Sequence, residues 1–172
     1  MVTLRLPSVA AGDVGAVLSY FEQEQLDGGW LPEIPLVSAE QAIGDWLDAW
    51  AARPSRNGPT FVVTIPSETR FIGIVGLVDR GECIVEMIYG MAPRWRGRGL
   101  ASRAVRLASH WAASQPGVRT VELRIDHDLI DSQHVAANAG FVVAGTVTPV
   151  RSVHWETSED PRYVLQWPPL GS

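Results

Sequence analysis

The most chemically suggestive part of the sequence is an arginine-rich, glycine-containing segment. Residues 87–121 contain six arginines and no aspartate or glutamate, although the whole protein carries a net charge of −5. At the centre, residues 94–102 read Arg-Trp-Arg-Gly-Arg-Gly-Leu-Ala-Ser, and an amphipathic helical pattern follows. The first backbone N–H groups of a helix lack intrahelical partners, the helix dipole favours negative charge there, and glycine allows close approach. The sequence therefore predicts a binding site for a phosphate-bearing ligand.

Two groups of polar residues near this segment are candidates for proton transfer. Glu86 lies seven residues before Pro93 on a predicted strand. An amine substrate arrives largely as ammonium and must lose a proton before it attacks, so Glu86 is a candidate general base, directly or through water. A solvated carboxylate or an ion pair explains the same residue equally well. Asp126, His127 and Asp128 follow a predicted buried strand and are candidates for substrate binding or proton relay, although an ordinary polar loop is the commoner explanation.

The composition excludes several classes of protein. A length of 172 residues with 46% apolar content predicts a single domain over residues 1–172. Neither a signal sequence nor an apolar run near 18 residues is present, which predicts a cytoplasmic protein without membrane segments. All fourteen basic residues are arginines, which excludes a lysine Schiff base and a lysine-dependent phosphate loop.

The cysteine count and the overall charge narrow the choice further. Cys83 is the lone cysteine, so neither an internal disulfide nor a cysteine-rich zinc site is expected, and no metal site is predicted. We interpret Cys83 as a small buried strand residue. An acidic protein with a single basic patch suits one polyanionic ligand better than nucleic acid, which requires a broad basic surface.

The predicted elements alternate between strands and helices, which indicates a single α/β domain with a mixed, mostly antiparallel twisted sheet flanked by helices. The helix after the glycines should face inward with Leu100, Ala104, Leu107, Ala108 and Trp111. Asp131 or Ser132 should cap a short helix that Gly140 closes. A final hairpin should pair residues 150–155 with residues 163–167. The other predicted strands are residues 3–6, 61–65, 71–78, 84–91, 118–125 and 141–148, and the other helices are residues 13–25 and one that begins at a Ser38–Gln41 capping box.

Two blocks of the sequence resemble the GNAT N-acetyltransferase superfamily. Residues 91–101, Met-Ala-Pro-Arg-Trp-Arg-Gly-Arg-Gly-Leu-Ala, resemble its acyl-CoA motif, Arg/Gln-x-x-Gly-x-Gly/Ala after a strand and a proline. Arg94 and Arg96 both fit the first position, and the spacing from Pro93 favours Arg96. Residues 122–124 and 132–141 resemble the strand, short helix and Gly-Phe ending of the branch that includes ribosomal-protein N-terminal acetyltransferases.

The resemblance implies an acyl-CoA-dependent N-acyltransferase with a splayed central strand pair. Acetyl-CoA, or another acyl-CoA, would be the co-substrate, and the strand ending at Met91 would pair with the pantetheine arm. Ser132 would contact the CoA tail, and Trp30 would lie in a loop that borders the acceptor, where a tryptophan closing the edge of the core is an equal alternative. Backbone amides of the motif would hold the CoA pyrophosphate, and these belong to Gly97, Arg98, Gly99, Leu100, Ala101 and Ser102. The side chains of Arg96, Arg98 and Arg103 would add positive charge.

Two departures from the family pattern concern the second block. The usual Asn before the short helix falls at Leu129, and the common Tyr that protonates the departing thiolate falls at Ala136. Cofactor binding rests mainly on backbone groups and should survive the first change. The second leaves the proton donor unassigned, and a longer or polar acyl group could occupy the space at Ala136.

The acceptor is expected to be a small-molecule amine or a peptide N-terminus, cationic rather than acidic because the rest of the protein is acidic. The sequence does not decide between a monomer and a homodimer. A non-catalytic acyl-CoA sensor and transfer of a non-acetyl group are the alternatives. A dinucleotide-binding fold is disfavoured, because Ser102 replaces the third glycine of that fingerprint and the upstream hairpin does not fit a βαβ unit.

Overall fold

The computed structural model describes residues 1–5, 13, 15–17, 19, 20, 59–147, 150–152, 156–158 and 162–167. The described residues between 13 and 20 are helical, in agreement with the predicted first helix. Trp30, the glycine-rich loop around it and the predicted helix after Ser38 lie outside the described residues. In the described part of the chain, no helix is long and apolar enough to cross a membrane.

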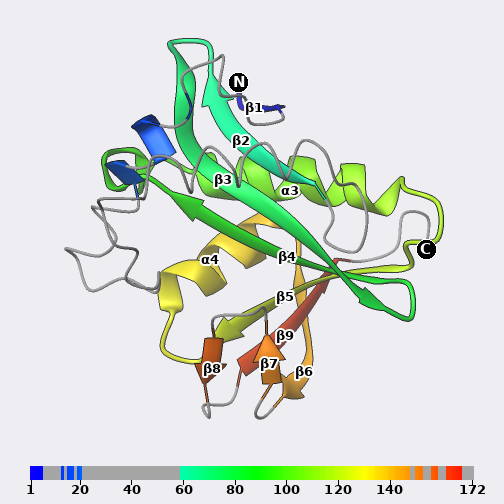
Figure 1. Ribbon diagram of the computed structural model, residues 1–172. Helices are drawn as coiled ribbons and strands as arrows, with labels where there is room; N and C mark the ends of the chain where they lie inside the picture. The colour runs from blue at the N-terminus through cyan, green and yellow to red at the C-terminus, as the bar shows by residue number, and fades with distance from the viewer. Residues whose placement is uncertain are drawn as a thin grey trace.

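Seven strands form one twisted sheet (Figure 1). Its order is β1-β2-β3-β4-β5-β9-β6, and every neighbouring pair is antiparallel except β4 and β5. The predicted α/β class with a mixed, mostly antiparallel sheet is therefore confirmed. The strands are β1 (Thr3–Arg5), β2 (Thr60–Ile65), β3 (Glu68–Gly81), β4 (Ile84–Met91), β5 (Thr120–Asp126), β6 (Val142–Val147) and β9 (Arg162–Trp167).

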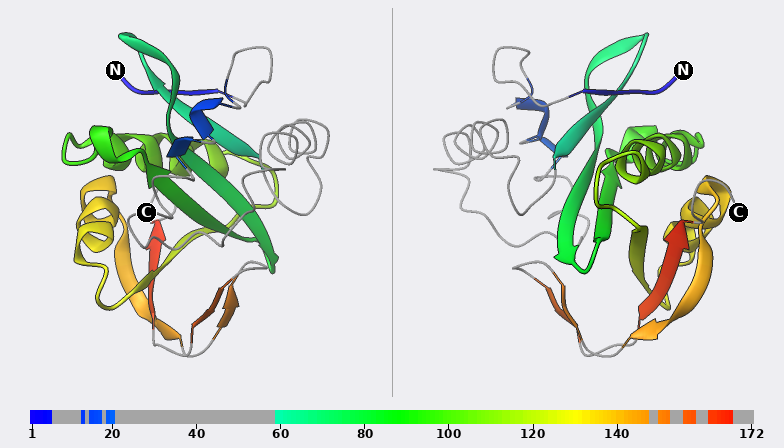
Figure 2. Two further views of the ribbon diagram at one scale, coloured as in Figure 1. Left: turned by 60° about the vertical axis from the view of Figure 1, so that its left-hand side comes forward. Right: turned by 90° about the vertical axis from the view of Figure 1, so that its right-hand side faces the viewer.

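Two helices, α3 (Leu100–Ala113) and α4 (Ile130–Ala139), cover one side of the sheet (Figure 2). The small hairpin of β7 (Val150–Ser152) and β8 (Glu156–Ser158) lies on the other side. Side chains alternate along a strand, so Met87 and Met91 of β4 join the core with α3 while Glu86 points to the opposite face. This division separates an apolar layer from a polar face on which chemistry can take place.

The central strands β4 and β5 begin as neighbours and then diverge. Their parallel ladder contains three pairs, of which Glu86 with Glu122 is the last, although β4 continues to Met91 and β5 to Asp126. Figure 1 shows the two arrows separating toward their carboxyl ends. The predicted splayed central pair is therefore confirmed, and we call the interval between the diverging backbones of β4 and β5 the wedge.

The β3–β4 pairing depends on a glycine. Gly73 lies opposite Met91, and a Cβ on Gly73 would be 2.6 Å from the carbonyl oxygen of Gly90 and in collision with the Met91 sulfur. Only a residue without a side chain lets Met91 fold over β3 into the core. The end of β4, where the ligand is expected, is thereby held tightly against β3.

The predicted final hairpin is wrong. β7 pairs with β8 in a separate two-stranded sheet, and β9 lies between β5 and β6, antiparallel to both. Residues 163–167 are mostly apolar, and in the position between β5 and β6 Trp167 packs on Phe141 with ring centroids 5.4 Å apart. The predicted pairing considered sequence neighbours and overlooked this contact with a more distant segment.

Three local predictions also need correction. Helix α4 begins at Ile130 without a side-chain cap, so neither Asp131 nor Ser132 caps it. Leu107 and Trp111 of α3 are 43% and 39% exposed, because the inward face is filled by the smaller Ala104, Val105 and Ala108. The Trp111 ring instead meets Phe61 edge-on at 5.2 Å.

Cys83 is exposed in the β3–β4 turn rather than buried in a strand. The turn has Glu82 and Cys83 at its centre, with φ values of 53° and 66°. Two consecutive residues with positive φ match the twist of a two-residue hairpin. The sequence does not predict this turn, because neither residue is glycine or asparagine.

Candidate active site

The glycine loop connects the end of β4 to α3 through a short 3₁₀ turn, η2 (Pro93–Trp95). Gly97 and Gly99 have φ values of 69° and 66°, a conformation that side chains disfavour. A Cβ on either glycine meets no atom within 4 Å among the described residues. The glycines are therefore required by the backbone path, and they leave the space beside the loop open for a ligand.

The first turn of α3 presents backbone N–H groups toward this space. Gly99 is the N-cap and makes no side-chain capping bond, and the Arg103 amide makes the first intrahelical bond, to the Gly99 carbonyl at 3.4 Å. The amides of Leu100, Ala101 and Ser102 precede that bond, so they are the donors that a helix N-terminus offers to an anion. The described first turn contains no acidic residue that would compete.

Two arginines of the loop pack against Trp95. The guanidinium carbons of Arg98 and Arg94 lie 4.9 Å and 5.5 Å from the centre of the indole ring. These cation–π contacts orient both guanidinium groups beside the loop. The loop therefore combines backbone donors with positive charge, as the sequence predicts.

Arg96 ties the loop to the end of β4, where its Nε donates a hydrogen bond to the Met91 carbonyl at 2.9 Å. The Ala92 amide donates to the Ile72 carbonyl of β3 at 3.0 Å. Backbone groups of successive strand residues point alternately to the two sides, so those of Met91 and Tyr89 point to the side of β5. No ladder pair with β5 extends this far. The wedge is thus lined by backbone groups that a bound ligand can use.

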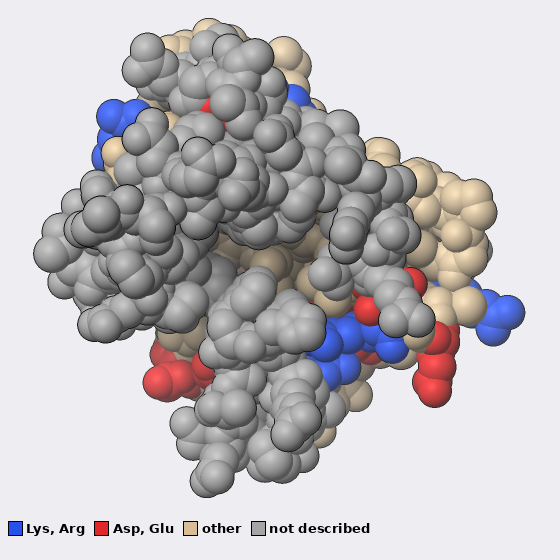
Figure 3. Space-filling model, in the orientation of Figure 1, with Lys and Arg blue, Asp and Glu red and all other residues tan. Residues whose placement is uncertain are grey.

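Glu86 is buried on the polar face and is held by two arginines. Its Oε2 accepts a hydrogen bond from Arg80 Nε at 2.5 Å and lies 3.6 Å from Arg124 Nε. Arg124 Nη2 also lies 3.6 Å from Glu122 Oε2, and Gln166 Nε2 donates to Glu122 Oε1 at 2.9 Å. Figure 3 shows basic and acidic atoms side by side on this side of the molecule. Glu86 therefore belongs to an ion-pair network at the start of the wedge, and its role as a general base stays a prediction.

The network shows which site residues the sequence reasoning missed. Arg80 and Arg124 were not predicted, although Arg124 alternates with apolar residues in a strand that was interpreted as buried. A charged residue at every second position of a central strand is the signal that one face is polar. Arg80 gives no comparable signal, because its contact depends on the register of β3 against β4.

Asp126 and His127 lie where β5 ends and the turn into α4 begins. Asp126 shares the polar face with Glu122 but lies four residues further along, about 13 Å at the usual rise per residue. Gln133 of α4 fastens the turn, as its Nε2 donates to the carbonyls of Asp126 at 3.2 Å and His127 at 2.9 Å. His127 and Asp128 are exposed. The structure therefore separates this acidic turn from Glu86 along the wedge.

Ser132 is joined to β4. Its Oγ lies 2.6 Å from the Tyr89 hydroxyl, which also donates to the Ser132 carbonyl at 3.0 Å. Burial raises the pKa of Tyr89 to about 12, while the hydrogen bond with Ser132 acts in the opposite direction. Ala136, one turn further along α4, is fully buried in the core. No open space for a larger acyl group therefore surrounds the Ala136 side chain.

Tyr20 is a further residue near the end of β4 that the sequence did not reveal. Its side chain is 4% exposed, and a Cβ on Gly90 would collide with its hydroxyl. Burial raises the pKa of Tyr20 to about 12, with the charge of Arg96 opposing the shift. A phenol from the N-terminal helix thus covers Gly90 on the face opposite Tyr89.

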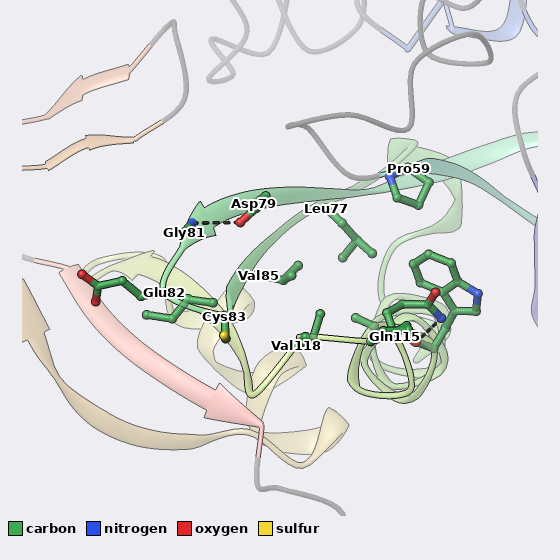
Figure 4. Close-up of a pocket in the computed structure, with 14 residues that line it drawn as sticks. Pro59, Leu77, Asp79, Gly81, Glu82, Cys83, Val85, Gln115 and Val118 are labelled. Atoms are coloured by element: carbon green, nitrogen blue, oxygen red, sulfur yellow. Dashed lines mark hydrogen bonds between the residues drawn. The ribbon is translucent and has the colours of Figure 1, made fainter.

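A separate cavity of about 470 Å³ lies at the other end of the sheet. Figure 4 shows Glu82 and Cys83 of the β3–β4 turn at one end of the lining, Gln115 at the other, and Val85 and Val118 between them. None of the predicted site residues lines this cavity. Among the described residues, no group of three His, Cys, Asp or Glu side chains is arranged to hold a metal ion.

Comparisons with known proteins agree with this geometry. A sequence model of the acetyltransferase (GNAT) domain matches residues 2–142. A search of curated protein sequences found no match.

Solved structures similar to this chain include a putative ribosomal-protein-serine acetyltransferase from Vibrio cholerae, with a TM-score of 0.76, 18% identity and coverage of 98% of this chain and 94% of that chain. RimJ of Mycobacterium smegmatis, in complex with CoA-disulfide, has a TM-score of 0.77 and 17% identity, and the match covers 96% of this chain and 80% of that chain. An aminoglycoside acetyltransferase in complex with coenzyme A has a TM-score of 0.72 and 16% identity, and the match covers 96% of this chain and 94% of that chain. These likenesses establish the fold.

Proposed function

Because this chain belongs to the GNAT acetyltransferase family and is an acyl-CoA-dependent N-acetyltransferase, we propose that it transfers an acetyl group from acetyl-CoA to a primary amine by direct attack. The observation that carries the proposal is the wedge between β4 and β5, which opens after Glu86 beside the glycine loop. Holding both reactants in one cleft converts a bimolecular reaction into an effectively unimolecular one.

The glycine loop and α3 would hold the CoA pyrophosphate. The amides of Leu100, Ala101 and Ser102 supply hydrogen-bond donors, and the left-handed conformation of Gly99 leaves the approach open. Arg98, oriented by Trp95, would add a salt-sensitive attraction for the other phosphates. Amides, open space and positive charge occur together here, so the residues present fit this cofactor.

The pantetheine arm would lie along β4 within the wedge. The backbone groups of Tyr89 and Met91 face the side of β5 without a ladder partner there, so they offer an extended ligand the bonds of a missing strand. The Met91 carbonyl is already held by Arg96. We assign the Met91 amide to the thioester oxygen, where it would stabilise the developing negative charge.

Glu86 is proposed as the general base. It lies on β4 where the wedge begins, on the polar face, and Arg80 and Arg124 fix its orientation through Oε2. Proton acceptance therefore falls to Oε1, directly or through a water molecule. Asp126 and His127, further along the same wall, are proposed to border the acceptor.

The acceptor is proposed to be a cationic small molecule or a peptide N-terminus, and the protein is proposed to work in the cytoplasm. The similar structures include enzymes named for ribosomal proteins, aminoglycosides and spermidine, so the fold accommodates both kinds of acceptor. The exposed His127–Asp128 turn at the mouth of the wedge supports a positively charged acceptor.

Thiol release from acetyl-CoA in the presence of a panel of amines tests the proposal. Turnover that depends on an amine supports acyl transfer, whereas tight CoA binding without turnover would indicate a non-catalytic sensor. Direct attack requires no covalent enzyme intermediate, so Cys83→Ser should retain wild-type rates, since Cys83 lies in the turn at the far end of β4. An acyl adduct on Cys83 during turnover would contradict direct attack.

A further inference from the structure

The cavity of about 470 Å³ beside the β3–β4 turn takes no part in the proposed acetyl transfer. It lies at the start of β4, whereas the glycine loop follows the end of that strand. The length of β4, about 23 Å at the usual rise per residue, separates the two sites. Small-molecule sites have volumes of about 300–1,000 Å³. The cavity is therefore large enough for a ligand of its own.

The walls of this cavity are mostly apolar. The side chains of Leu77, Val85 and Val118 point toward a common space, and the end of α3 borders it (Figure 4). Leu77 is buried, whereas Trp111 of α3 is 39% exposed and lines the same space. A partly exposed tryptophan among aliphatic side chains suits a ligand with an apolar body, and an indole ring also attracts cations.

The carboxylates at one end of the cavity favour a positively charged ligand. Among the described residues that line it, Asp79 and Glu82 are the charged ones, and both are acidic. Asp79 Oδ1 accepts a hydrogen bond from the Gly81 amide at 2.8 Å, which holds the carboxylate beside the cavity. The Glu82 side chain extends away from it in Figure 4, so Asp79 supplies the nearer charge.

The end of α3 adds to this preference. The helix ends at Ala113, and residues on both sides of that end line the cavity. The C-terminal end of a helix carries the negative end of its dipole, which favours a cation. Two basic neighbours do not cancel this effect within the lining: the His110 ring contacts Trp167 with centroids 5.1 Å apart, and the exposed Arg119 lies outside the lining.

We propose that this cavity is a second binding site, which takes an organic cation with an apolar body. The positively charged group lies beside Asp79 and the end of α3, and the apolar part packs against Leu77, Val118 and Trp111. This site is separate from the glycine loop and does not depend on acetyl transfer.

Cys83 provides a direct readout of the cavity. Its thiol is exposed, lines the cavity and is the lone cysteine of the sequence, so alkylation by iodoacetamide reports on this place alone. The probe is benzyltrimethylammonium, whose quaternary nitrogen cannot accept an acetyl group. At about ten times its dissociation constant it should slow alkylation by about three- to tenfold. Hydrocinnamate, a carboxylate of similar size, should not. Equal protection by both compounds, or by neither, would overturn the proposal.

Asp79→Asn tests the charge and leaves the turn intact, because asparagine keeps the oxygen that accepts from Gly81. Calorimetry should show an affinity for benzyltrimethylammonium about three- to fivefold lower, with the difference shrinking as salt is added. Asp131→Asn is the matched control, because it removes an exposed carboxylate in the first turn of α4, away from the cavity. An unchanged affinity in Asp79→Asn, or an equal loss in the control, would contradict the assignment.

Val118→Phe tests the cavity itself. Val118 is partly buried and points into the open space, so a larger side chain should fill it and abolish binding without changing any charge. Urea unfolding checks that the variant is folded. Binding retained by the folded variant would place the probe elsewhere. Protection of Cys83 that grows with protein concentration in the absence of probe would show that a second copy of the chain occupies the cavity, which would also overturn the proposal.

Discussion

Glu86 of β4 and Glu122 of β5 lie directly opposite each other in the last pair of the parallel ladder, and both are buried on the polar face of the sheet. Arg124 is shared between them, with 3.6 Å from its Nε to Glu86 Oε2 and 3.6 Å from its Nη2 to Glu122 Oε2. The two carboxylates thus have the same strand position, burial and cation. They differ in that Glu86 also pairs with Arg80 and Glu122 with Gln166.

Glu86→Gln should lower the rate of amine acetylation by about 10²–10⁴-fold near neutral pH, because it keeps the shape of the side chain and removes its basicity. Raising the pH should recover part of the loss by supplying free amine. Initial rates across a pH series measure both effects. The change also leaves Arg80 and Arg124 without their shared carboxylate, so a loss of stability of about 1–3 kcal/mol is expected. A fully buried ion pair would cost more, but both arginines are partly exposed.

Glu122→Gln separates chemistry from stability. It removes the matching carboxylate on β5, so the variant should lose about as much stability as Glu86→Gln. Its rate of amine acetylation should fall by less than about tenfold. Equal rate losses in the two variants would assign the whole effect to the ion-pair network. A Glu86→Gln protein with wild-type rates would move the base to Asp126, His127 or ordered water.

Gly99→Glu should abolish CoA binding, because it places bulk and negative charge in front of the α3 amides. Gly117→Glu is a matched control: Gly117 also has positive φ, 83° against 66° for Gly99, and a Cβ on either meets no described atom within 4 Å. Backbone strain and charge are therefore alike, whereas the position differs. Calorimetry with acetyl-CoA should show binding by the control alone, and equal affinities for both variants would mean that the phosphate site lies elsewhere.

The ligand-binding part of the fold was predictable because its signals are local. Glycines before a helix, proline after a strand and a 3.6-residue apolar period lie within a short stretch of the chain, and the strand predicted at residues 84–91 is β4 with the same bounds. The conformations of Gly97 and Gly99 follow from the same residues. Such features depend little on the rest of the protein.

The parts of the fold and of the site that were not predicted depend on contacts between distant segments. The ion pair of Glu86 with Arg80 requires the β3–β4 register, and the bond from Tyr89 to Ser132 joins residues 43 positions apart. The insertion of β9 between β5 and β6 is likewise a choice among strand pairings that sequence periodicity does not rank. Catalytic residues could be proposed from the sequence, but not the partners that hold them.

Tyr89 should make stability fall at high pH. Its pKa is raised by burial from about 10 in the unfolded chain to about 12 in the folded protein. The neutral phenol therefore favours folding below pH 10, and this contribution is lost as pH rises toward 12, because the unfolded state releases its proton first. The free energy of unfolding should therefore fall by about 1–3 kcal/mol over this pH range.

Tyr89→Phe is expected to be less stable than the wild type by about 1 kcal/mol at pH 7, because the hydroxyl hydrogen bonds are lost. From pH 10 to 12 the difference should shrink and then reverse. Urea unfolding at several pH values measures it, and the absence of lysine from the sequence removes the usual competing titration in this range. A constant difference between the two proteins would mean that the phenol is solvated in the folded state.

The last prediction concerns the acceptor. The ion-pair network around Glu86 balances two arginines against two glutamates, so it does not attract either sign of charge strongly. The exposed Asp128 at the mouth of the wedge therefore decides the preference, and a cationic amine should be favoured over an anionic one.

Asp128→Asn should raise the KM for a cationic amine by about two- to fivefold and leave that for an uncharged amine unchanged, with the difference shrinking as salt is added. Glu82→Gln removes one exposed charge at the opposite end of β4 and is the control, for which no change is expected. A screen of cationic and anionic amines against several acyl-CoAs, with thiol release as the signal, supplies the acceptors for this comparison. A clear preference for an anionic acceptor would overturn the charge argument while leaving acyl transfer intact.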